Sequence, residues 1–289
     1  MSRDLTPLKI IERSIQKKYR KKLWNPFIAA VKRYELIQPG DRIAVCISGG
    51  KDSMLLAKLM QQLHRYGDGG RPFDLVFLVM DPGYSGANLQ KIIDNAELLD
   101  IPINIFQSDI FEVVSETGRS PCYLCARMRR GHLYKRAQDL GCNKIALGHH
   151  FSDVVETTLM GMLYGAQIQA MMPKLHSKNF HGMELIRPLY CVHEDDIIAW
   201  ARYNNLEFIR CACQLTEKIA TSEDAIGGSK REEVKQLIRS LKCDHKDVEK
   251  CIFQSIHMVN LNTLIGYSLN GQEHSFLDNY SPFFWEKER

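Results

Sequence analysis

Glycine, lysine and hydroxyl side chains follow a short apolar run near the start of the chain. The run is RIAVCI (42–47), and the next six residues are SGGKDS (48–53). Glycines between a strand and a helix let the backbone approach an anion, and the helix N-terminus adds free N–H groups and the positive end of its dipole. The sequence therefore predicts a phosphate-binding loop made of Ser48, Gly49, Gly50, Lys51 and Ser53.

This loop differs from the two commonest nucleotide-binding loops. A Walker A motif requires glycine five residues before the glycine of its Gly-Lys pair, where this chain has Val45, and the dinucleotide fingerprint does not match. SGGKDS instead resembles the PP-loop of ATP pyrophosphatases, which release pyrophosphate while they adenylate a substrate. The alternative is a glycine turn that only caps a helix, and six matching residues in a strand–loop–helix context argue against it.

Cysteines form a second candidate site. Cys122 and Cys125 have CxxC spacing at a predicted helix start, and Cys211 and Cys213 follow after a predicted strand. Two thiolates at CxxC spacing can share a metal, and a helix N-terminus favours the deprotonated thiol. A structural zinc usually takes two well-spaced pairs, whereas three cysteines on a four-iron cluster would leave one iron open for chemistry. The spacing alone leaves zinc, iron–sulfur and dithiol redox roles open.

The rest of the composition is typical of a cytosolic globular protein. Hydrophobic residues make up 45% and charged residues 25% of the 289. No stretch approaches the about 18 apolar residues of a membrane helix, and residues 1–14 are too charged for a signal peptide. We therefore expect a cytoplasmic protein without a membrane partner, whose thiols stay reduced. Five of its nine cysteines are interpreted as ordinary buried or incidental thiols: Cys46, Cys142, Cys191, Cys243 and Cys251.

Positive charge is concentrated at the N-terminus. Residues 1–33 contain ten Lys and Arg against two Asp and Glu, whereas residues 34–289 contain 28 against 32. A basic segment on a near-neutral body indicates a polyanionic partner, nucleic acid before membrane, although a solvated helix face is the alternative. The RNA-binding candidates in this segment are Lys17, Lys18, Arg20, Lys21 and Lys22.

Apolar runs of strand type alternate with helical periodicity through most of the chain. The expected strands are 42–47, 74–80, 101–106, 144–147, 187–189 and 206–209, and the expected helices are 6–34, 54–65, 88–99, 123–140, 153–164 and 194–203. This alternation predicts an α/β fold, a doubly wound, mostly parallel sheet with helices on both faces. Loops 48–53, 81–86 and 148–153 follow strands and are expected to converge on one site.

Three segments are expected along the chain. Residues 1–36 form a basic helical segment, residues 37–214 the ATP-binding domain with the candidate cysteines, and residues 215–289 a C-terminal appendage of helix and hairpin. Within the appendage, Ser229 and Glu232 suggest a capping box before a helix over 231–242. Asn270-Gly271 predicts a tight hairpin turn.

In combination, the motifs resemble the TtcA/TtuA family of PP-loop tRNA thiolases, and within it the tRNA 2-thiocytidine synthetases. The resemblance runs from about residue 36 to 214, through DRIAVCISGGKDS, PCYLCARMRRG, LGHHFSDVVETTLMGMLYG, MMPKL, IRPLY and FIRCAC. It implies a PP-loop (adenine nucleotide alpha hydrolase-like) fold and an ATP-dependent tRNA sulfurtransferase. Such an enzyme adenylates a cytidine of the anticodon loop with ATP and Mg²⁺ and replaces its 2-oxygen with sulfur. The resemblance also implies a [4Fe–4S] cluster on Cys122, Cys125 and Cys211, with Cys213 as the close rival.

Further residues are assigned roles as a hypothesis. Asp52 and Asp153 would coordinate Mg²⁺ or position the base oxygen for attack on the α-phosphate. Lining of the nucleotide pocket is assigned to Asp81, Gly83 and Gly148, and RNA phosphate contacts to Arg127, Arg129 and Arg130. Asp81 has the alternative of capping a turn, and the three arginines that of a solvated helix face.

The chain departs from the family pattern at two places. Ser152-Asp153 stands where the family often has two acidic residues, so Asp153 would carry the acidic role alone, and residues 210–213 (RCAC) replace a Pro-Cys-x-x-Cys-like segment. The alternative functions are a cluster-independent PP-loop ligase or amidase and an RNA-binding module with structural zinc. The expected partners are tRNA and a sulfur donor, either a desulfurase or inorganic sulfide, and the resemblance suggests a homodimer.

Overall fold

The computed structural model describes residues 6–67, 72–108, 121–209 and 230–280, without the side chains of 121–127 and 279. The chain divides into two compact units, Met1–Leu237 and Ile238–Arg289, with the division inside helix α10 (Lys230–Asp244). The boundary that we predict after residue 214 lies outside the described residues.

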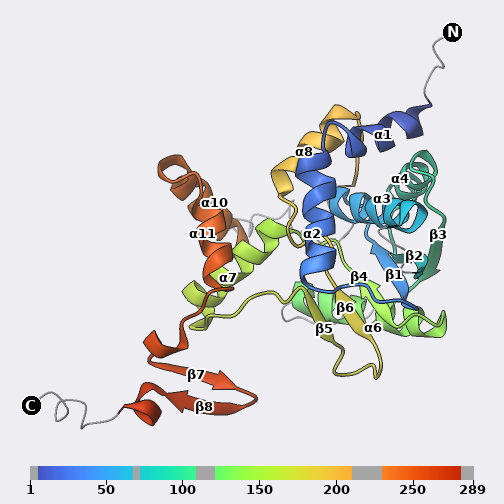
Figure 1. Ribbon diagram of the computed structural model, residues 1–289. Helices are drawn as coiled ribbons and strands as arrows, with labels where there is room; N and C mark the ends of the chain where they lie inside the picture. Colours follow the sequence, from blue (N-terminus) through green and yellow to red (C-terminus); the bar gives the residue numbers. More distant parts are fainter. Residues whose placement is uncertain (1–5, 68–71, 109–120, 210–229, 281–289) are drawn as a thin grey trace, which may run out of the picture. The chain divides into compact units, whose positions relative to one another are not determined.

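The first unit alternates strands and helices (Figure 1). Its helices are α1 (Pro7–Gln16), α2 (Asn25–Arg33), α3 (Lys51–Tyr66), α4 (Gly86–Leu98), α6 (Pro121–Asp139), α7 (Phe151–Gly165), α8 (Glu194–Tyr203) and the start of α10. Its strands are β1 (Arg42–Ile47), β2 (Asp74–Asp81), β3 (Ile103–Gln107), β4 (Lys144–Ala146), β5 (Lys174–His176) and β6 (Glu184–Ile186).

The strands of this unit form one sheet in the order β3-β2-β1-β4-β6-β5. All the pairings are parallel except the one between β5 and β6. In register, Ile43 of β1 is opposite Leu75 of β2 and Lys144 of β4. The predicted mostly parallel α/β fold is confirmed.

Side chains of β1 alternate between the two faces of the sheet, as strand geometry requires. Ile43, Val45 and Ile47 belong to a core shared with α1, α2, α3, α4 and α8, whereas Ala44 and Cys46 belong to a smaller core shared with α6. In Figure 1, α6 accordingly lies on the opposite side of the sheet from α3. Both faces are covered, which explains why β1 is a continuous apolar run.

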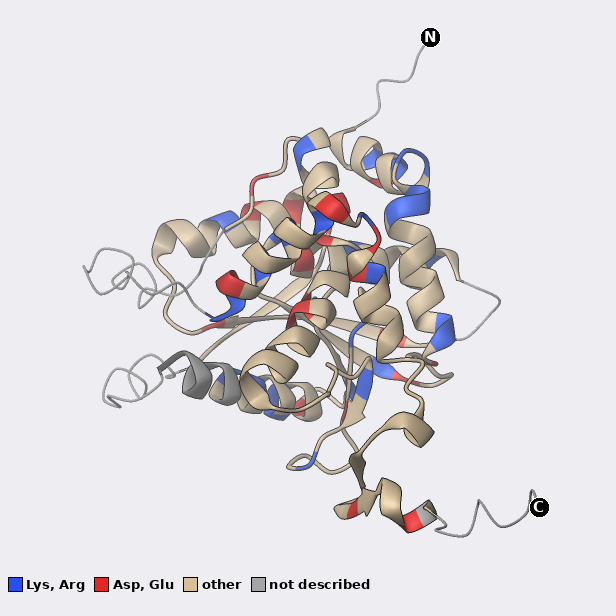
Figure 2. Ribbon diagram, turned by 90° about the vertical axis from the view of Figure 1, so that its left-hand side faces the viewer, with Lys and Arg blue, Asp and Glu red and all other residues tan. Residues whose placement is uncertain are grey.

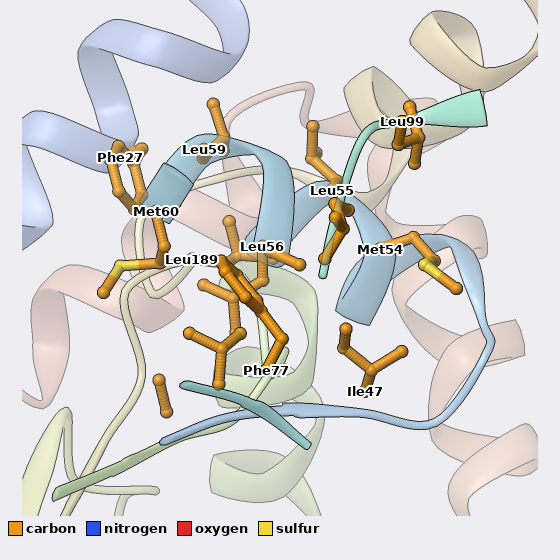
Figure 3. Packing of buried hydrophobic residues seen from close by; sticks show 14 of the residues in the cluster. Phe27, Ile47, Met54, Leu55, Leu56, Leu59, Met60, Phe77, Leu99 and Leu189 are labelled. Atoms are coloured by element: carbon orange, nitrogen blue, oxygen red, sulfur yellow. The ribbon is translucent and has the colours of Figure 1, made fainter. Parts of the chain in front are cut away.

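Helix α3 is the centre of the larger core. Its residues 53–63 are all buried, and Figure 3 shows Leu56 and Met54 beside Phe77 and Ile47 of the sheet. Each fully buried leucine of this kind contributes about 1.5–3 kcal/mol to folding. Lys58 is buried on the same helix, and its Nζ lies 2.6 Å from Glu12 of α1. This packing fixes the helix whose N-terminus follows the phosphate loop.

The N-terminal segment is helical but interrupted. Thr6 caps α1, and Pro7 occupies its first turn, where the missing N–H costs nothing. A π-helical stretch, Arg20–Trp24, separates α1 from α2. Leu23 and Phe27 are fully buried and attach this segment to the main core.

Two predicted strands are wrong. Residues 187–189 form a turn in which the Tyr190 N–H donates to the Arg187 carbonyl (3.1 Å), and the strand β6 ends before them. Residues 206–209 pair with no strand in the described part of the chain. The Glu207 carbonyl is satisfied instead by Asn95 Nδ2 of α4 (2.9 Å). The antiparallel edge strand β5 was not predicted, because Lys174–His176 is too short to show strand periodicity.

The second unit contains the end of α10, α11 (Val248–Ser255), two short 3₁₀ helices (Leu261–Thr263 and Phe276–Asn279) and a hairpin of β7 (Gly266–Leu269) and β8 (Gln272–Ser275). Asn270 and Gly271 have φ of 54° and 82°. Positive φ at both central residues is the type I′ turn that suits a two-residue hairpin. The predicted hairpin is confirmed.

Candidate active site

The phosphate loop (Ser48–Ser53) joins the carboxyl end of β1 to α3, as the sequence predicts. Helix α3 begins at Lys51, earlier than expected, so Lys51, Asp52 and Ser53 form its first turn instead of a preceding loop. The reason is that Gly50 takes the N-cap position with an extended backbone (φ −77°, ψ 160°). First-turn N–H groups have no intrahelical acceptor, so they remain available to an anion at the positive end of the helix dipole.

The two serines of the loop have different positions. Ser53 is buried, and its Oγ lies 3.1 Å from the Ser48 nitrogen and 3.2 Å from the Ser48 hydroxyl. The Ser53 hydroxyl donates to the Gly50 carbonyl (2.9 Å). Ser48 is exposed. Ser53 therefore holds the loop in shape, and Ser48 is the hydroxyl that a bound anion can reach.

Two glycines allow other segments to reach the loop. Gly49 has φ +82°, and a Cβ there would lie 2.6 Å from both Ile92 Cγ1 and Ile209 Cδ1. Gly148 follows β4, and a Cβ there would lie 3.1 Å from the Ser53 nitrogen. Because these distances are shorter than ordinary van der Waals contacts, a side chain at Gly49 or at Gly148 would push the neighbouring segments away from the phosphate loop.

Lys51 lies between two carboxylates. Its Nζ is 2.8 Å from Glu194 Oε1 and 3.1 Å from Asp52 Oδ2. Burial opposes the charge of Lys51, but Asp52 and Glu194 outweigh burial and raise the pKa of Lys51. Burial also opposes the charge of Glu194, but the hydrogen bond from Lys51 holds the pKa of Glu194 below its usual value. Lys51 is therefore cationic at neutral pH, and an incoming polyphosphate must compete with these carboxylates for it.

One carboxylate oxygen of Asp52 has no hydrogen-bond partner among the described residues. Asp52 Oδ1 is buried and accepts no hydrogen bond within the described residues. His150 Nε2 lies 3.8 Å away, beyond hydrogen-bond distance. A buried carboxylate oxygen without a partner is unfavourable, and a hard cation with a preference for oxygen ligands would satisfy it. The site therefore fits Mg²⁺ at Asp52.

Asp153, in contrast, uses both oxygens on protein donors. The His150 N–H donates to Asp153 Oδ2 (2.9 Å), and the Asp153 N–H donates to His150 Nδ1 (3.4 Å), which together form a capping box at the start of α7. Arg231 donates to Asp153 Oδ1 (2.9 Å). Asp153 is therefore a firmly oriented carboxylate.

A cavity of 450 Å³ brings several predicted residues together. Its lining includes Ser48, Asp52, Ser53, Gly148, Asp153, Arg129 and Arg130. A second cavity of 650 Å³, on the α8 side, is lined in part by Gly50, Lys51 and Glu194. The first turn of α3 is thus accessible from two sides. Of the three loops expected to converge, those after β1 and β4 share the first cavity.

His149 is a neutral histidine in the wall of the first cavity. Burial, followed by the charge of Arg187, lowers the pKa of His149 to about 4. Its Nδ1 is buried without a hydrogen-bond partner among the residues described. At neutral pH the ring can therefore form a hydrogen bond with an uncharged group without adding charge to the site.

Asp81 and Gly83 form a turn after β2. Asp81 Oδ1 accepts from the backbone N–H groups of Gly83 (2.9 Å) and Tyr84 (2.7 Å), and Gly83 has φ 97°. The structure thus shows the turn-capping geometry considered for Asp81. Neither residue is among the described residues that line the first cavity, although Met80 is.

Helix α6 extends along the first cavity. Arg129 and Arg130 line it, and Arg129 Nη2 donates to the Tyr84 hydroxyl (3.3 Å). Cys122 and Cys125 are in the first turns of the same helix, one to two turns before Arg129. The side chains of Cys122, Cys125 and Arg127 are not described, and Cys211 and Cys213 lie outside the described residues.

The five other cysteines are free thiols, as interpreted from the sequence. Cys46 and Cys142 are buried, Cys191 is half-buried, and Cys243 and Cys251 are exposed. Burial raises the pKa of Cys46 to about 12 and also raises the pKa of Cys142 and of Cys191. These three thiols are therefore protonated and unreactive at neutral pH.

The N-terminal basic segment (Lys17–Lys22) forms a cluster of Lys and Arg next to the N-terminus in Figure 2. Two of its cations contact α8 or its C-terminal end: Lys22 Nζ lies 2.8 Å from Asp196, and Lys18 Nζ lies 3.5 Å from the ring centre of Tyr203. Arg20 lines a separate cavity of 680 Å³ that also includes Trp24 and Tyr66. Lys17 and Lys21 are exposed.

Four ionisable residues of the site were not assigned a role from the sequence: His150, Glu156, Glu194 and Arg231. His150 and Asp153 have the spacing of a helix N-cap and its third residue, a local signal that could have identified the capping box. Glu194 begins a predicted helix, and Arg231 follows Ser229 in the predicted capping box. Neither carries a local sign of a partner, because Lys51 and Asp153 are remote in sequence.

Comparison with known proteins gives matches over most of the chain. The family model of the PP-loop domain, ATP_bind_3, matches residues 11–219. The tRNA-cytidine(32) 2-sulfurtransferase of Anaeromyxobacter sp. (strain K) is 32% identical over 255 residues, 87% of this chain and 84% of that protein. The protein of the same name from Coxiella burnetii (strain Dugway 5J108-111) is 34% identical over 260 residues, 88% of this chain and 96% of that protein.

A solved structure shares the fold. The U34-tRNA thiolase NcsA from Methanococcus maripaludis, which holds a [4Fe–4S] cluster, superposes with a TM-score of 0.61 at 20% identity, over 81% of this chain and 76% of that one. Among the described residues, no helix is both long and apolar enough to span a membrane. The resemblance to the PP-loop tRNA thiolases is confirmed, and the chain belongs to the PP-loop family that includes the tRNA-cytidine(32) 2-sulfurtransferases.

Proposed function

We propose that this chain is an ATP-dependent tRNA sulfurtransferase that adenylates cytidine 32 of tRNA and replaces its 2-oxygen with sulfur. The observation that carries the proposal is the 34% identity to the tRNA-cytidine(32) 2-sulfurtransferase of Coxiella burnetii over 96% of that protein. Fold alone would not decide function. The chain also has a helix N-terminus suited to an anion, two differently held carboxylates and a CxxC pair.

The triphosphate of ATP is proposed to bind at the N-terminus of α3. The first-turn N–H groups and the exposed Ser48 hydroxyl would donate to phosphate oxygens. Lys51 would exchange its contact with Glu194 for one with phosphate. Gly49 and Gly50 are needed there because the backbone itself approaches the anion.

Asp52 is the carboxylate that we propose holds Mg²⁺, because its Oδ1 is buried without a partner among the described residues. When bound, Mg²⁺ would neutralise phosphate charge as it builds up during the reaction. For Asp153 we propose the second role, that of positioning the base oxygen. Its two carboxylate oxygens are engaged by His150 and Arg231, which fix its orientation.

The first chemical step joins the cytidine 2-oxygen to the α-phosphate and releases pyrophosphate. Arg129 and Arg130 line the cavity and would offset the negative charge that develops there. The neutral ring of His149 can form a hydrogen bond with the base edge without repelling these arginines. In the second step a C–S bond forms, the C–O bond breaks, and AMP leaves with the former 2-oxygen.

Sulfur delivery is assigned to a [4Fe–4S] cluster on Cys122, Cys125 and Cys211, with Cys213 as the alternative third ligand. Three cysteines leave one iron open, and that iron would supply sulfide to the activated carbon. Two described features support the assignment. The CxxC pair begins the helix whose Arg129 lines the cavity, and Ile209, two residues before Cys211, packs on Gly49. The Methanococcus maripaludis thiolase, of the same fold, holds such a cluster.

Transfer RNA is proposed to bind through the N-terminal basic segment and the arginines of α6. Lys17 and Lys21 are exposed and suited to sequence-independent phosphate contacts. Arg20 lies beside Trp24 in a cavity where a base could stack. A cytoplasmic location, a sulfur donor and a homodimer remain part of the same proposal.

The test is a thiolation assay with anaerobically purified protein. Transcripts with C32, or with U32 and a target U34, are incubated with ATP and sulfide, digested and analysed by mass spectrometry for thionucleosides, with AMP and pyrophosphate measured in parallel. We expect 2-thiocytidine from the C32 transcript alone, and only with ATP. Thiouridine from the other transcript would overturn the substrate assignment.

Metal analysis of the same preparations tests the cluster. We expect about four irons and four sulfides per chain, lost together with thiolation in Cys122→Ala and in one of Cys211→Ala and Cys213→Ala. Cys243→Ala, at an exposed thiol, is the control. Full activity in iron-free protein would refute the cluster, and stoichiometric zinc without ATP turnover would favour an RNA-binding module.

A further inference from the structure

One arginine of α10 bridges two carboxylates of α7. Arg231 lies outside residues 11–219, which the PP-loop domain family model matches. Its Nε donates to Glu156 Oε2 (2.7 Å), and its Nη2 donates to Asp153 Oδ1 (2.9 Å). Asp153 and Glu156 are one helical turn apart, so a single planar guanidinium can span them. Charge-assisted hydrogen bonds of this length belong to the strong class.

Burial of the Glu156 carboxylate explains why a cation must lie beside it. Its side chain is only 4% exposed, and a buried carboxylate without a counter-charge is strongly unfavourable. Among the described residues its cationic partners are Arg231 and Lys235, whose Nζ lies 3.7 Å from Glu156 Oε1. Both cations come from α10. Helix α7 therefore carries a buried carboxylate whose cationic partners come from the first turns of α10, although burial outweighs these cations and raises the pKa of Glu156.

The same bridge fixes the direction of Asp153. One of its oxygens is held by the His150 N–H at the start of α7, and the other by Arg231. Without Arg231 the carboxylate would keep a single anchor and could rotate toward the cavity that it lines. The orientation of the candidate catalytic carboxylate therefore depends on a residue that does not itself line this cavity among the described residues.

The contacts continue from α10 to the phosphate loop. Lys235 lies one turn after Arg231, and its Nζ is 3.7 Å from Glu194 Oε2. Glu194 in turn accepts a hydrogen bond from Lys51. Charges of opposite sign thus alternate from α10 along α7 and α8 to the first turn of α3.

We propose that Arg231 is a positioning residue of the adenylation site, which holds Asp153 in its working orientation through the bridge to Glu156. The proposal deepens the proposed function and rests on it. It also means that the first turn of α10 lies against the start of α7, beside the site. Ile209 packs on Gly49 and Arg231 binds Asp153, so the described residues on either side of 210–229 are both held at the site.

The experiment compares Arg231→Ala and Arg231→Lys with wild type, and Lys230→Ala is the matched control. Lys230 is on the same turn but pairs with Glu233 and lies over the Tyr164 ring, away from the site. With tRNA and ATP, we expect the kcat for pyrophosphate release in Arg231→Ala to fall on the order of 100-fold. The KM for ATP should change less than about threefold, because the triphosphate contacts remain. Arg231→Lys should recover part of kcat, and Lys230→Ala should match wild type.

A double variant separates positioning from stability. Glu156→Gln combined with Arg231→Met removes the buried carboxylate charge together with its cationic partner, so urea unfolding should show stability restored toward wild type, while kcat stays as low as in Arg231→Ala. Recovery of kcat together with stability would overturn the proposal. It would also be overturned if Arg231→Ala kept its kcat and lost only ATP affinity, or if Lys230→Ala had the same effect.

Hydrogen exchange provides a readout that needs no turnover. We expect faster exchange of amides 151–156 in Arg231→Ala than in Lys230→Ala, with amides in β1 unchanged. Equal exchange in the two variants would refute the bridge itself. If Arg231→Ala shows the expected faster exchange but no tRNA supports pyrophosphate release by the wild-type protein, the proposed function fails and the bridge stands as a structural contact.

Discussion

Alanine at Gly49 would test whether the phosphate loop is held in place by contact with remote segments. Gly49 combines φ +82° with a Cβ position 2.6 Å from Ile92 Cγ1 and Ile209 Cδ1. Gly40 offers a matched control, because it has φ +83° and nothing within 4 Å of its Cβ position. Gly40→Ala therefore measures backbone strain alone, and Gly49→Ala measures strain plus contact.

The magnitudes follow from these two parts. An alanine in left-handed backbone costs about 1–2 kcal/mol, and overpacking a core costs about 1–3 kcal/mol more. Gly40→Ala should lower the free energy of unfolding by the first amount, and Gly49→Ala by about 2–5 kcal/mol. Ile209→Ala removes two of the three close atoms, so in that background the penalty of Gly49→Ala should shrink but stay above that of Gly40→Ala, because Ile92 remains.

Urea unfolding of wild type, the three single variants and the double mutant supplies the comparison, and ATP titration calorimetry supplies the functional readout. We expect Gly49→Ala to weaken ATP binding by about tenfold or more, because the loop must move away from Ile92, and Gly40→Ala to leave it unchanged. Equal stability losses at Gly40 and Gly49, or a Gly49 penalty that Ile209→Ala does not reduce, would refute the contact.

Three further predictions concern charge. Glu194→Gln should tighten ATP binding by roughly fivefold, about 1 kcal/mol after solvent screening, because Lys51 is released from a competing carboxylate; weaker binding in calorimetry would mean that Glu194 assists the nucleotide. The pKa of His149, lowered to about 4 from an ordinary 6.5, implies that the unfolded chain takes up a proton that the folded chain does not. The contribution of His149 to the free energy of unfolding is therefore fully present above about pH 6.5 and is lost as the pH falls toward 4, by about 3 kcal/mol in total. The free energy of unfolding, measured in urea, should depend less on pH across that range in His149→Gln, and an unchanged pH dependence would contradict the burial argument. Lys21→Ala should lower the log–log salt dependence of tRNA binding by about 0.7–0.9, the value for one phosphate contact, and an unchanged slope in filter binding would exclude Lys21 from the RNA surface.

Local patterns determined much of the protein. Continuous apolar runs predicted β1 and β2, because a parallel sheet covered on both faces requires strands that are apolar on both sides. SGGKDS was placed correctly at a strand-to-helix junction, since glycine and hydroxyl residues define such turns through neighbours in the chain. The CxxC pair was expected at a helix start, and the backbone of α6 begins at Pro121. Asn270-Gly271 predicted its hairpin for the same local reason.

Local patterns misled where the environment decides. Residues 206–209 are apolar enough for a strand, but Glu207 bonds to Asn95 and Ile209 packs on Gly49. No sequence pattern indicated that Arg129 and Arg130 line the cavity, as the structure shows, and their expected contact with RNA phosphate stays a prediction. A helical pattern indicates which residues share a face, and only packing shows what that face contacts.

The sequence by itself thus determined most of the elements and the position of the candidate phosphate loop, because backbone propensity, periodicity and turn chemistry act between near neighbours. Only the tertiary structure decided the charge partners: Glu194 with Lys51, Arg231 with Asp153 and Glu156, and the spare oxygen of Asp52. Lys51 and Glu194 are separated by 143 positions, and Asp153 and Arg231 by 78. Pairs so far apart meet only because the sheet and its helices pack in one arrangement, which no local pattern encodes.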